Sequence, residues 1–377
     1  MRASTPIFVS SILALGCVEL PSVGEVPEPT SHAAVDGQAR GPLLVAHGGQ
    51  GSPAARSDGP ATAADRGFEL LASDDAEPLA AAIAAIEILE DDPRFNAGTG
   101  ANLRLDARTI EADAALMDDR QRFGAVAGIA GIRNPIRVAE AVLDTPHLFL
   151  AGEGAQAFAE TLGLEARDLS TDQARRKLER GYAQLFAEQG PWAAWDWRAH
   201  WNFAGPPPAD LDEAMAMLRQ AEAEAEAEAA GAGTPAIEPD ATRDTVGVVV
   251  RTGAGRYAAA LSTGGTTLAI HGRVGDVPIL GAGLYAGPHG AVAATGKGEA
   301  IMRERVAAEV YALLEAGETP NDAIRLGIRA VSADEGVGVI AVSERGWGAL
   351  ATSQMAWAVR DGEQRHQADT WIRRRDR

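Results

Sequence analysis

A sharp change in sequence character near position 245 constrains the fold most. A polar, low-complexity stretch ends there, and a run of strand-forming residues begins. Residues 209–230 (ADLDEAMAMLRQAEAEAEAEAA) favour helix, yet their Ala-Glu alternation offers no apolar stripe to a core. We therefore predict a mobile, solvated connector over residues 206–244. Residues 245–250 (TVGVVV) are apolar and typical of a buried strand. Ordered structure must then come from residues 42–205 and 245–377. A mobile segment directly before a buried strand is unusual, and it makes sense if solvent must reach the junction or if the chain is cut there.

The overall composition excludes several classes of protein. The chain has 377 residues, with 34 Lys and Arg against 53 Asp and Glu, so its net charge is −19. Binding to nucleic acid needs a basic surface, so this balance argues against a nucleic-acid partner. A single cysteine, Cys17, can form neither an internal disulfide nor a thiolate zinc site, and the seven histidines show no metal-ligand spacing.

The N-terminus has the features of an export signal. Residues 1–16 carry Arg2 and an apolar run too short to span a bilayer, and we predict a signal peptide there. The letters ALGC, which end at Cys17, resemble a bacterial lipoprotein box, with Ala in place of the usual Leu at its first position. We predict lipidation of Cys17, a flexible tether over 17–41, and an exported protein, periplasmic or anchored to a bacterial membrane. The alternatives are a cytoplasmic protein and a buried N-terminal strand with an incidental cysteine.

The rest of the chain alternates between strand and helix patterns. Strands are predicted at 42–46, 110–117, 124–130, 245–250, 257–262, 337–343 and 347–352, and helices at 76–91, 135–144, 153–162, 170–188, 299–316 and 320–331. Glycine-rich loops are expected between 262 and 299. Residues 190–208 hold four of the seven tryptophans and are predicted to form a loop that packs its rings on the domain surface, with an active-site cover or a membrane contact as alternatives.

Thr245 stands where the connector ends, and its position suggests a chemical role. A hydroxyl is a poor nucleophile unless a base lies beside it, and a threonine at a chain's own N-terminus can use its α-amine as that base. A free α-amine has a pKa of about 7.7–8, so much of it is neutral at working pH. Thr245 is internal, so this chemistry would require cleavage of the Asp244–Thr245 bond.

A series of motifs then identifies a family. The motifs are HGG at 47–49, LEDDPRFNAGTGA at 89–101, IEADAALMD at 110–118, GAVAG at 124–128, NPI at 134–136, GEGA at 152–155, DTVG at 244–247, STGGTT at 262–267, GRVGDVPILGAG at 272–283 and TGKGE at 295–299. In this order they resemble the plant-type L-asparaginase / isoaspartyl peptidase family of N-terminal-nucleophile hydrolases, which is related to glycosylasparaginase. The resemblance implies an α+β fold, a four-layer αββα sandwich. It also implies cleavage into an α subunit and a β subunit of residues 245–377, and an (αβ)2 assembly.

The resemblance also assigns roles to residues of the site. Thr245 would be the nucleophile for self-cleavage and for substrate, and Thr263 the second threonine that orients it. Thr295 and Gly296 would form the oxyanion hole. Asn96 would lie near the nucleophile.

The same resemblance implies a substrate clamp and one ion. Arg273 would hold the α-carboxylate of an aspartyl unit and Asp276 its α-amine, helped by the Gly298 carbonyl. Backbone carbonyls in the stretch from Leu89 and Glu90 to Asn96 would hold a structural sodium ion. The implied substrates are small amino-acid or β-aspartyl peptide molecules, and no organic cofactor is required.

Other functions compete with this one. A phosphate loop at Gly296-Lys297-Gly298 lacks both the glycine required at 291 and the Ser or Thr required at 298. A non-catalytic surface lipoprotein that keeps the fold as a binding module would be expected to lose the threonines and the clamp. Glycosylasparaginase-like cleavage of glycan-linked asparagine stays open, because it uses the same clamp. Lys297 departs from the family pattern and could alter the leaving-group preference.

Overall fold

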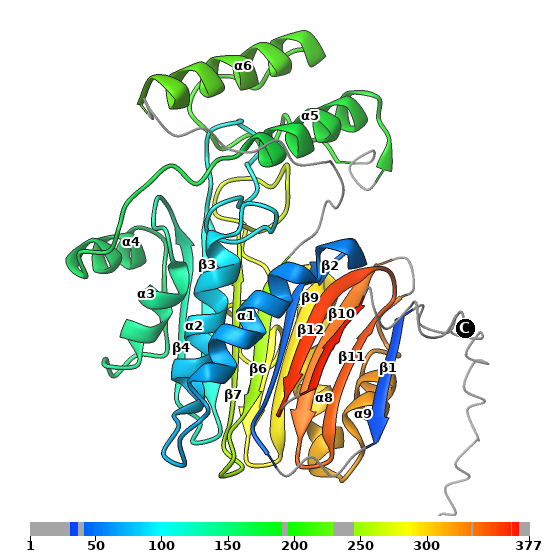
Figure 1. The fold of residues 1–377 in the computed structure, drawn as a ribbon. Helices are drawn as coiled ribbons and strands as arrows, with labels where there is room; N and C mark the ends of the chain where they lie inside the picture. Colours follow the sequence, from blue (N-terminus) through cyan, green and yellow to red (C-terminus); the bar gives the residue numbers. More distant parts are fainter. Residues whose placement is uncertain are drawn as a thin grey trace, which may run out of the picture.

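Two β-sheets lie at the centre of the molecule (Figure 1). The computed structural model describes residues 31–36, 41–190, 195–228, 245–332, 335–362 and 364–368. The first sheet has the order β1-β11-β10-β9-β8, with β1 Ser31–Asp36, β8 Leu284–Gly287, β9 Gly290–Gly296, β10 Val337–Ser343 and β11 Gly346–Ala351. The second has the order β13-β12-β2-β6-β7-β3-β4-β5, with β2 Leu43–Gln50, β3 Ala112–Asp118, β4 Phe123–Ile129, β5 Phe149–Ala151, β6 Val246–Arg251, β7 Tyr257–Thr263, β12 Met355–Asp361 and β13 Gln364–Gln367.

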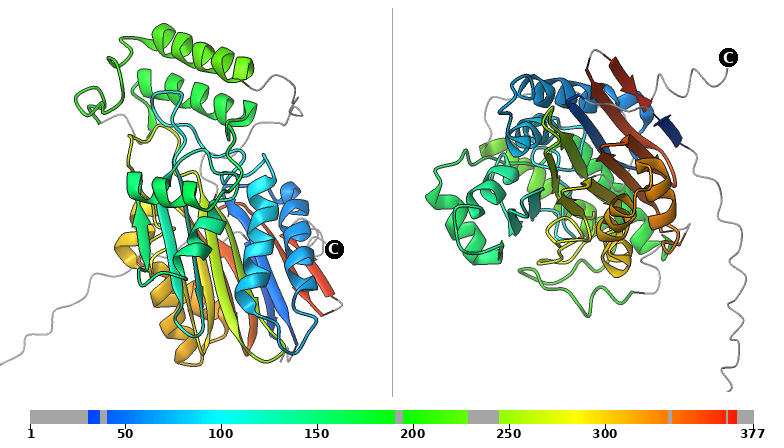
Figure 2. Two further views of the ribbon diagram at one scale, coloured as in Figure 1. Left: turned by 90° about the vertical axis from the view of Figure 1, so that its left-hand side faces the viewer. Right: turned by 90° about the horizontal axis from the view of Figure 1, so that it is seen from below.

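Helices cover the outer faces of both sheets, so the fold is mixed α+β. They are α1 Asp58–Glu69, α2 Pro78–Asp91, α3 Pro135–Val142, α4 Gly152–Thr161, α5 Asp172–Phe186, α6 Leu211–Glu228, α7 Gly298–Glu304, α8 Val306–Glu315 and α9 Pro320–Gly327, with a short 3-10 helix at Ala54–Arg56. Helices α5 and α6 lie beyond the strand ends, at one end of the molecule (Figures 1 and 2).

Side-chain alternation along the strands explains why both faces of each sheet are buried. In β3, Ala114 and Leu116 contact the cluster that includes α1 and α2, whereas Ala115 and Met117 contact the cluster between the two sheets. In β10, Ile340 enters the cluster between the sheets, and its neighbours enter the cluster that includes α8 and α9. This period of two is the geometric signature of a strand.

The predicted strand at 245–250 is confirmed as β6, which is buried throughout. It pairs antiparallel with β2 on one side and with β7 on the other. A continuous apolar run without alternation suits a strand buried on both faces. The segments before and after the connector therefore share one sheet, and the start of β6 lies at its centre.

Several elements differ from the sequence-based expectation. The predicted helix at 299–316 is divided into α7 and α8 at Arg305, whose φ is 50°. Strands β8 and β9 form within the region expected to consist of glycine-rich loops. Residues 31–36, expected to belong to a flexible tether, pair with β11 as β1. The predicted signal peptide and Cys17 lie outside the described residues.

The expectation of a connector without an apolar face is wrong for α6. Ala214 and Leu218, one helical turn apart, are almost fully buried in a cluster with Leu178 and Leu185 of α5. The Ala-Glu repeat begins just after this turn. The two buried residues are surrounded by polar residues in the sequence, so the pattern did not display them as an apolar stripe. Residues 229–244 of the predicted connector lie outside the described residues.

Replacing Leu218 by alanine should therefore destabilise the α5–α6 unit by about 2–4 kcal/mol, the usual cost of a cavity left by a buried leucine. Amide hydrogen exchange in α5 and α6 should accelerate while exchange in β6 and β7 stays unchanged. The neighbouring exposed residue provides the control, and Arg219→Ala should change exchange little. Equal effects of the two substitutions would mean that α6 does not pack through Leu218.

The tryptophan-rich segment packs its rings on the domain, as predicted. Trp197 is buried against Phe186 of α5, with ring centroids 5.6 Å apart in an edge-on contact. The Arg198 guanidinium lies over the Trp197 ring at 4.3 Å, a cation–π geometry. Residues 191–194, including Trp192, lie outside the described residues.

Candidate active site

Two threonines from neighbouring strands meet at the centre of the larger sheet. Thr245 immediately precedes β6 and Thr263 ends β7, and the register places Val246 opposite Ser262. A hydrogen bond of 3.2 Å joins the Thr245 and Thr263 hydroxyl oxygens. Thr263 Oγ1 also accepts the Gly265 amide hydrogen at 3.1 Å. Both hydroxyls are nearly buried, so each is held in one orientation.

Asn96 holds the loop that follows Thr263. Its Nδ2 donates to the Gly265 carbonyl at 2.7 Å and lies 3.5 Å from Thr263 Oγ1. Its Oδ1 accepts the Asn102 amide hydrogen at 2.8 Å. The Asn102 side chain, which sequence reasoning did not single out, donates to the same Gly265 carbonyl at 2.9 Å. The structure thus places Asn96 beside the second threonine.

Arg273, Asp276 and Gly298 come together, as the resemblance implied. A methyl group on Gly298 would lie 2.9 Å from both Arg273 Nη2 and Asp276 Oδ1, so only glycine leaves both groups accessible here. Asp276 is buried and its Oδ2 has no hydrogen-bond partner among the described residues. A buried acceptor of this kind fits an incoming ammonium group. Burial raises the pKa of Asp276 to about 7.

The Arg273 guanidinium is engaged by a carboxylate of the site itself. Its Nε and Nη2 donate to Glu299 Oε1 at 3.0 and 2.9 Å. The Glu299 side chain is half exposed, whereas that of Arg273 is mostly buried. Glu299 can therefore turn towards solvent when another carboxylate binds Arg273.

A buried ionic network supports the loop that carries Arg273. Arg104 is fully buried and donates through Nε to Glu111 Oε2 at 3.1 Å and through Nη2 to the Arg273 carbonyl at 3.3 Å. Glu111 in turn accepts the Gly272 amide hydrogen at 2.9 Å. Asp113 is also buried and accepts the Gly128 amide hydrogen at 3.0 Å. Sequence reasoning missed this network, although its charges interrupt an apolar strand pattern.

The predicted oxyanion residues lie at the end of β9. Thr295 Oγ1 accepts the Gln50 amide hydrogen at 3.2 Å, which leaves its own hydroxyl hydrogen free to donate. Gly296 has a φ of 137°, and a methyl group there would lie 2.3 Å from the Gly336 carbonyl oxygen. Both conditions require glycine.

Strand β2 connects these residues to the threonine pair. His47 lies opposite Gly247 in the sheet, and Gln50 of the same strand reaches Thr295. His47 Nδ1 accepts the Gly49 amide hydrogen at 3.1 Å. Burial lowers the pKa of His47 to about 3, so the ring is neutral. These contacts hold the backbone of the HGG motif at the end of β2 in place.

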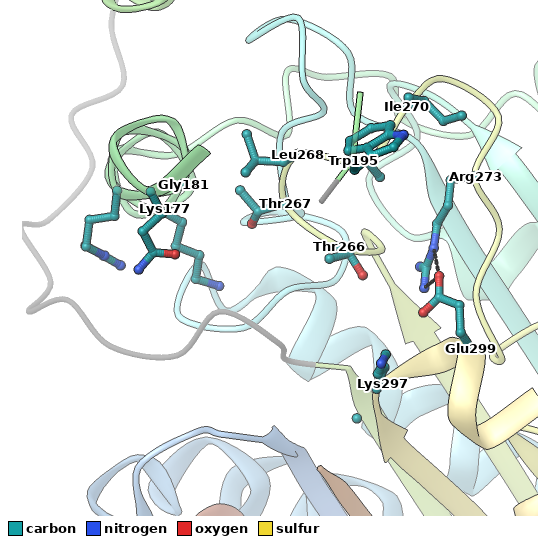
Figure 3. A pocket seen from close by; sticks show the side chains of 14 residues that line it. Lys177, Gly181, Trp195, Thr266, Thr267, Leu268, Ile270, Arg273, Lys297 and Glu299 are labelled. Carbon is teal, nitrogen blue, oxygen red and sulfur yellow. Dashed lines mark hydrogen bonds and ion pairs between the residues drawn. The ribbon is translucent and has the colours of Figure 1, made fainter. Parts of the chain in front are cut away.

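A cavity of about 490 Å³ lies beside the clamp (Figure 3). It is lined by Lys177, Arg180, Gly181, Gln184, Trp195, Thr266, Thr267, Leu268, Ala269, Ile270, Arg273, Gly296, Lys297 and Glu299. Arg273 and Gly296 therefore open into the same space. Lys297, which departs from the family pattern, is held by Glu335, with Nζ 3.0 Å from Oε1.

The segment expected to hold a sodium ion differs between its two named residues, Leu89 and Glu90, in whether the backbone carbonyl already accepts a hydrogen bond. Residue 93 is a proline without an amide hydrogen, so the Leu89 carbonyl lacks the usual helical donor four residues on. The Glu90 carbonyl instead accepts the Thr99 amide hydrogen at 2.7 Å. Leu89 thus fits a cation better than Glu90. Within the described residues, no group of three or more His, Cys, Asp or Glu side chains could hold a metal ion.

Comparisons with known proteins point the same way as this geometry. A family model described as "Asparaginase" matches residues 40–194 and 202–370. The chain is 36% identical over 253 residues to a "Plant-type L-asparaginase" from Pyrococcus furiosus, covering 67% of this chain and 68% of that protein. It is 32% identical over 338 residues to an "Isoaspartyl peptidase/L-asparaginase" from Mus musculus, covering 85% and 89%. A "Probable isoaspartyl peptidase/L-asparaginase 2" from Arabidopsis thaliana is 36% identical over 268 residues, covering 69% and 75%.

Proposed function

Because this chain belongs to the asparaginase family, we propose that it is an amidohydrolase that cleaves L-asparagine and β-aspartyl peptides with Thr245 as nucleophile. The single observation that supports this assignment most is the pair of buried hydroxyls, Thr245 and Thr263, 3.2 Å apart at the start of β6. The enzyme becomes active when it cuts its own chain between Asp244 and Thr245. The cut exposes an α-amine beside the Thr245 hydroxyl, and Asp244 itself lies outside the described residues.

The proposed reaction uses these groups in sequence. Thr245 Oγ1 attacks the side-chain carbonyl of the aspartyl unit while its α-amine takes the hydroxyl proton. The Thr295 hydroxyl and the Gly296 amide donate to the oxygen that becomes negative in the tetrahedral intermediate. The intermediate collapses, ammonia or an amine leaves with the proton, and an aspartyl ester stays on Thr245. Water then hydrolyses this ester and releases aspartate.

The clamp selects the substrate. The Arg273 guanidinium takes the α-carboxylate in place of Glu299, while Asp276 and the Gly298 carbonyl accept from the α-ammonium. Only an aspartyl unit with both α groups free satisfies these residues. Glycan-linked asparagine fits the same clamp and is the second candidate, but the names of the relatives favour asparagine and β-aspartyl peptides.

The proposed activity is tested by measuring kcat/KM of the cleaved protein on three substrates. These are L-asparagine, a β-aspartyl dipeptide and glycosylated asparagine. We expect the first two substrates to be hydrolysed faster than the third. A clear preference for the glycosylated substrate would move the protein to the second candidate. Absence of aspartate release from all three would contradict the proposed activity.

The affinity for L-asparagine should fall as the pH is lowered from 7.5 to 5.5. The pKa of Asp276 is raised to about 7, so below this pH the carboxyl becomes protonated and cannot pair with the substrate ammonium. KM should rise towards about tenfold per pH unit once the pH is well below that pKa. Initial rates across this range measure the effect, and a flat KM would contradict the ionic role of Asp276.

Asp276→Asn provides an independent check on the same carboxyl. A raised native pKa favours the protonated form, so the wild type should lose stability as the pH rises from about 4 through about 7. The amide variant cannot ionise, and its stability advantage over the wild type should therefore grow over this interval. Thermal unfolding at pH 4 and pH 8 measures the difference.

We further propose the four-layer αββα sandwich of the N-terminal-nucleophile hydrolases as the full description of the fold. Support comes from the core clusters, one between the sheets and one beneath each helical layer. Cleavage would yield a β subunit of residues 245–377, 133 residues long, and two αβ units would pair as (αβ)2.

Two other expectations stay proposals. One is a structural sodium ion held by backbone carbonyls near Leu89, which would stabilise the loop leading to Asn96. The other is export through residues 1–16 with a lipid on Cys17, supported by the sequence pattern. No helix in the described part of the chain is long and apolar enough to cross a membrane.

A further inference from the structure

We propose that the cavity between α5 and the clamp binds the leaving group of β-aspartyl dipeptides, with Arg180 recognising its terminal carboxylate. This inference rests on the proposed function and specifies its substrate. The favoured substrate is an aspartyl unit joined through its side chain to an apolar amino acid whose carboxylate is free.

The extent of the cavity supports a bulky leaving group. Asparagine releases only ammonia, which needs no space beyond the reacting carbonyl. The cavity nevertheless has a volume of about 490 Å³ and reaches from Arg273 and Gly296 to α5. In Figure 3, Lys177 and Gly181 of α5 lie on the opposite side of the cavity from Arg273 and Glu299, with Thr266 between them. A second residue attached to the aspartyl unit can occupy this space.

The charges that line the cavity favour an anion. Four cationic side chains and one carboxylate line it, namely Lys177, Arg180, Arg273, Lys297 and Glu299. Three of the cations donate hydrogen bonds to neighbouring side chains. Arg273 donates to Glu299, Lys297 to Glu335, and Lys177 to Asn102, whose Oδ1 lies 3.4 Å from Nζ.

Arg180 differs from these three residues. Among the residues that the structure describes, it has neither a hydrogen-bond partner nor an ion-pair partner, although it is partly buried. A guanidinium in this setting can take a carboxylate through two parallel hydrogen bonds. Arg180 therefore recognises the carboxylate, and Lys177 adds positive potential from the same helix.

An apolar wall defines the side chain of the leaving residue. Trp195, Leu268 and Ile270 line the cavity, and Trp195 and Ile270 lie near each other on the side of Arg273 (Figure 3). Such a surface favours an aliphatic or aromatic side chain over a charged one. The tryptophan-rich segment thus contributes one ring to the site, in addition to the rings that pack on α5.

The test uses the cleaved enzyme and three substrates, which are L-asparagine, β-aspartyl-leucine and β-aspartyl-leucinamide. The last two differ only in the terminal charge. We expect the wild type to hydrolyse the acid with a kcat/KM about tenfold above that of the amide, the scale of one charge-assisted contact. Arg180→Met should remove this advantage while leaving kcat/KM for L-asparagine unchanged, and Arg180→Lys should restore part of it.

Arg219→Met is the matched control, because Arg219 lies exposed on α6 and does not line the cavity. It should leave all three rates unchanged. Equal rates for the acid and the amide in the wild type would overturn the inference, as would an equal loss on all three substrates in Arg180→Met at equal amounts of cleaved protein. Either result leaves the proposed function intact as long as the wild type hydrolyses L-asparagine. Loss of that basal activity in the wild type would instead contradict the proposed function.

Discussion

Replacing Thr245 by alanine should leave the chain uncut and lower the hydrolysis of L-asparagine by about 10⁴-fold or more, the scale seen when a nucleophile is removed. The same hydroxyl performs both reactions in the proposed mechanism. The substitution removes one oxygen that contacts Thr263 at 3.2 Å and leaves the buried β6 strand intact. The loss should therefore come from chemistry, and the thermal unfolding temperature should change little.

A denaturing gel measures the cleavage. The wild type should give two bands, the shorter beginning at Thr245, and the variant a single band. Thr245→Ser keeps a hydroxyl and should still cut, whereas Thr266→Ala, which lines the cavity, should cut at the wild-type rate. A wild type that stays a single band after long incubation, or an alanine variant that still releases aspartate at the wild-type rate, would contradict the assignment of Thr245.

The second large effect is expected at the clamp. Arg273→Met should lower kcat/KM for L-asparagine by about 10²–10³-fold, because truncating one partner of a buried charge pair costs roughly 2–5 kcal/mol. The substrate carboxylate would lose its guanidinium, and Asp276 would lose the nearest cation. The main change should be in KM, since in the proposed mechanism the arginine binds the α-carboxylate and not the reacting carbonyl.

Glu299→Gln separates the two functions of this region. Glu299 occupies Arg273 in the absence of substrate, so its neutralisation should lower KM by a few fold and leave kcat unchanged. Steady-state kinetics of both variants on cleaved protein provide the comparison. A rise in KM for Glu299→Gln would show that Glu299 helps to hold the substrate and does not compete with it.

Much of the site was predictable because short motifs carry its geometry. Thr245, Thr263, Arg273, Asp276 and Gly298 were all identified from the sequence, and the structure brings them into two groups, the threonine pair and the cluster around Gly298. Many of the long strands and helices were also predictable, since each displays its own period over several residues, although α1 and β12 were not predicted. Strand β8 was missed because four residues are too few to display that period, and β9 was missed because it begins and ends with glycine in a glycine-rich region.

The parts that could not be predicted depend on contacts between distant segments. Asn102 meets Gly265 across 163 positions, and Gln50 meets Thr295 across 245. The burial of Leu218 and the charges of Arg104 and Glu111 likewise acquire meaning only when their neighbours are known. No local pattern encodes such partners, because pairing is set by sheet register and by packing of the whole chain.

The sequence by itself therefore determined the family and the candidate residues for the proposed nucleophile and clamp, because each of these residues lies within a short motif. Only the tertiary structure decided that α6 packs on α5, that a buried ionic network holds the loop of Arg273, and that Arg180 and Arg273 line one cavity. These features arise when segments far apart in the sequence bury the same surface. The packed fold, and no single segment, sets the space and charge that a leaving group meets.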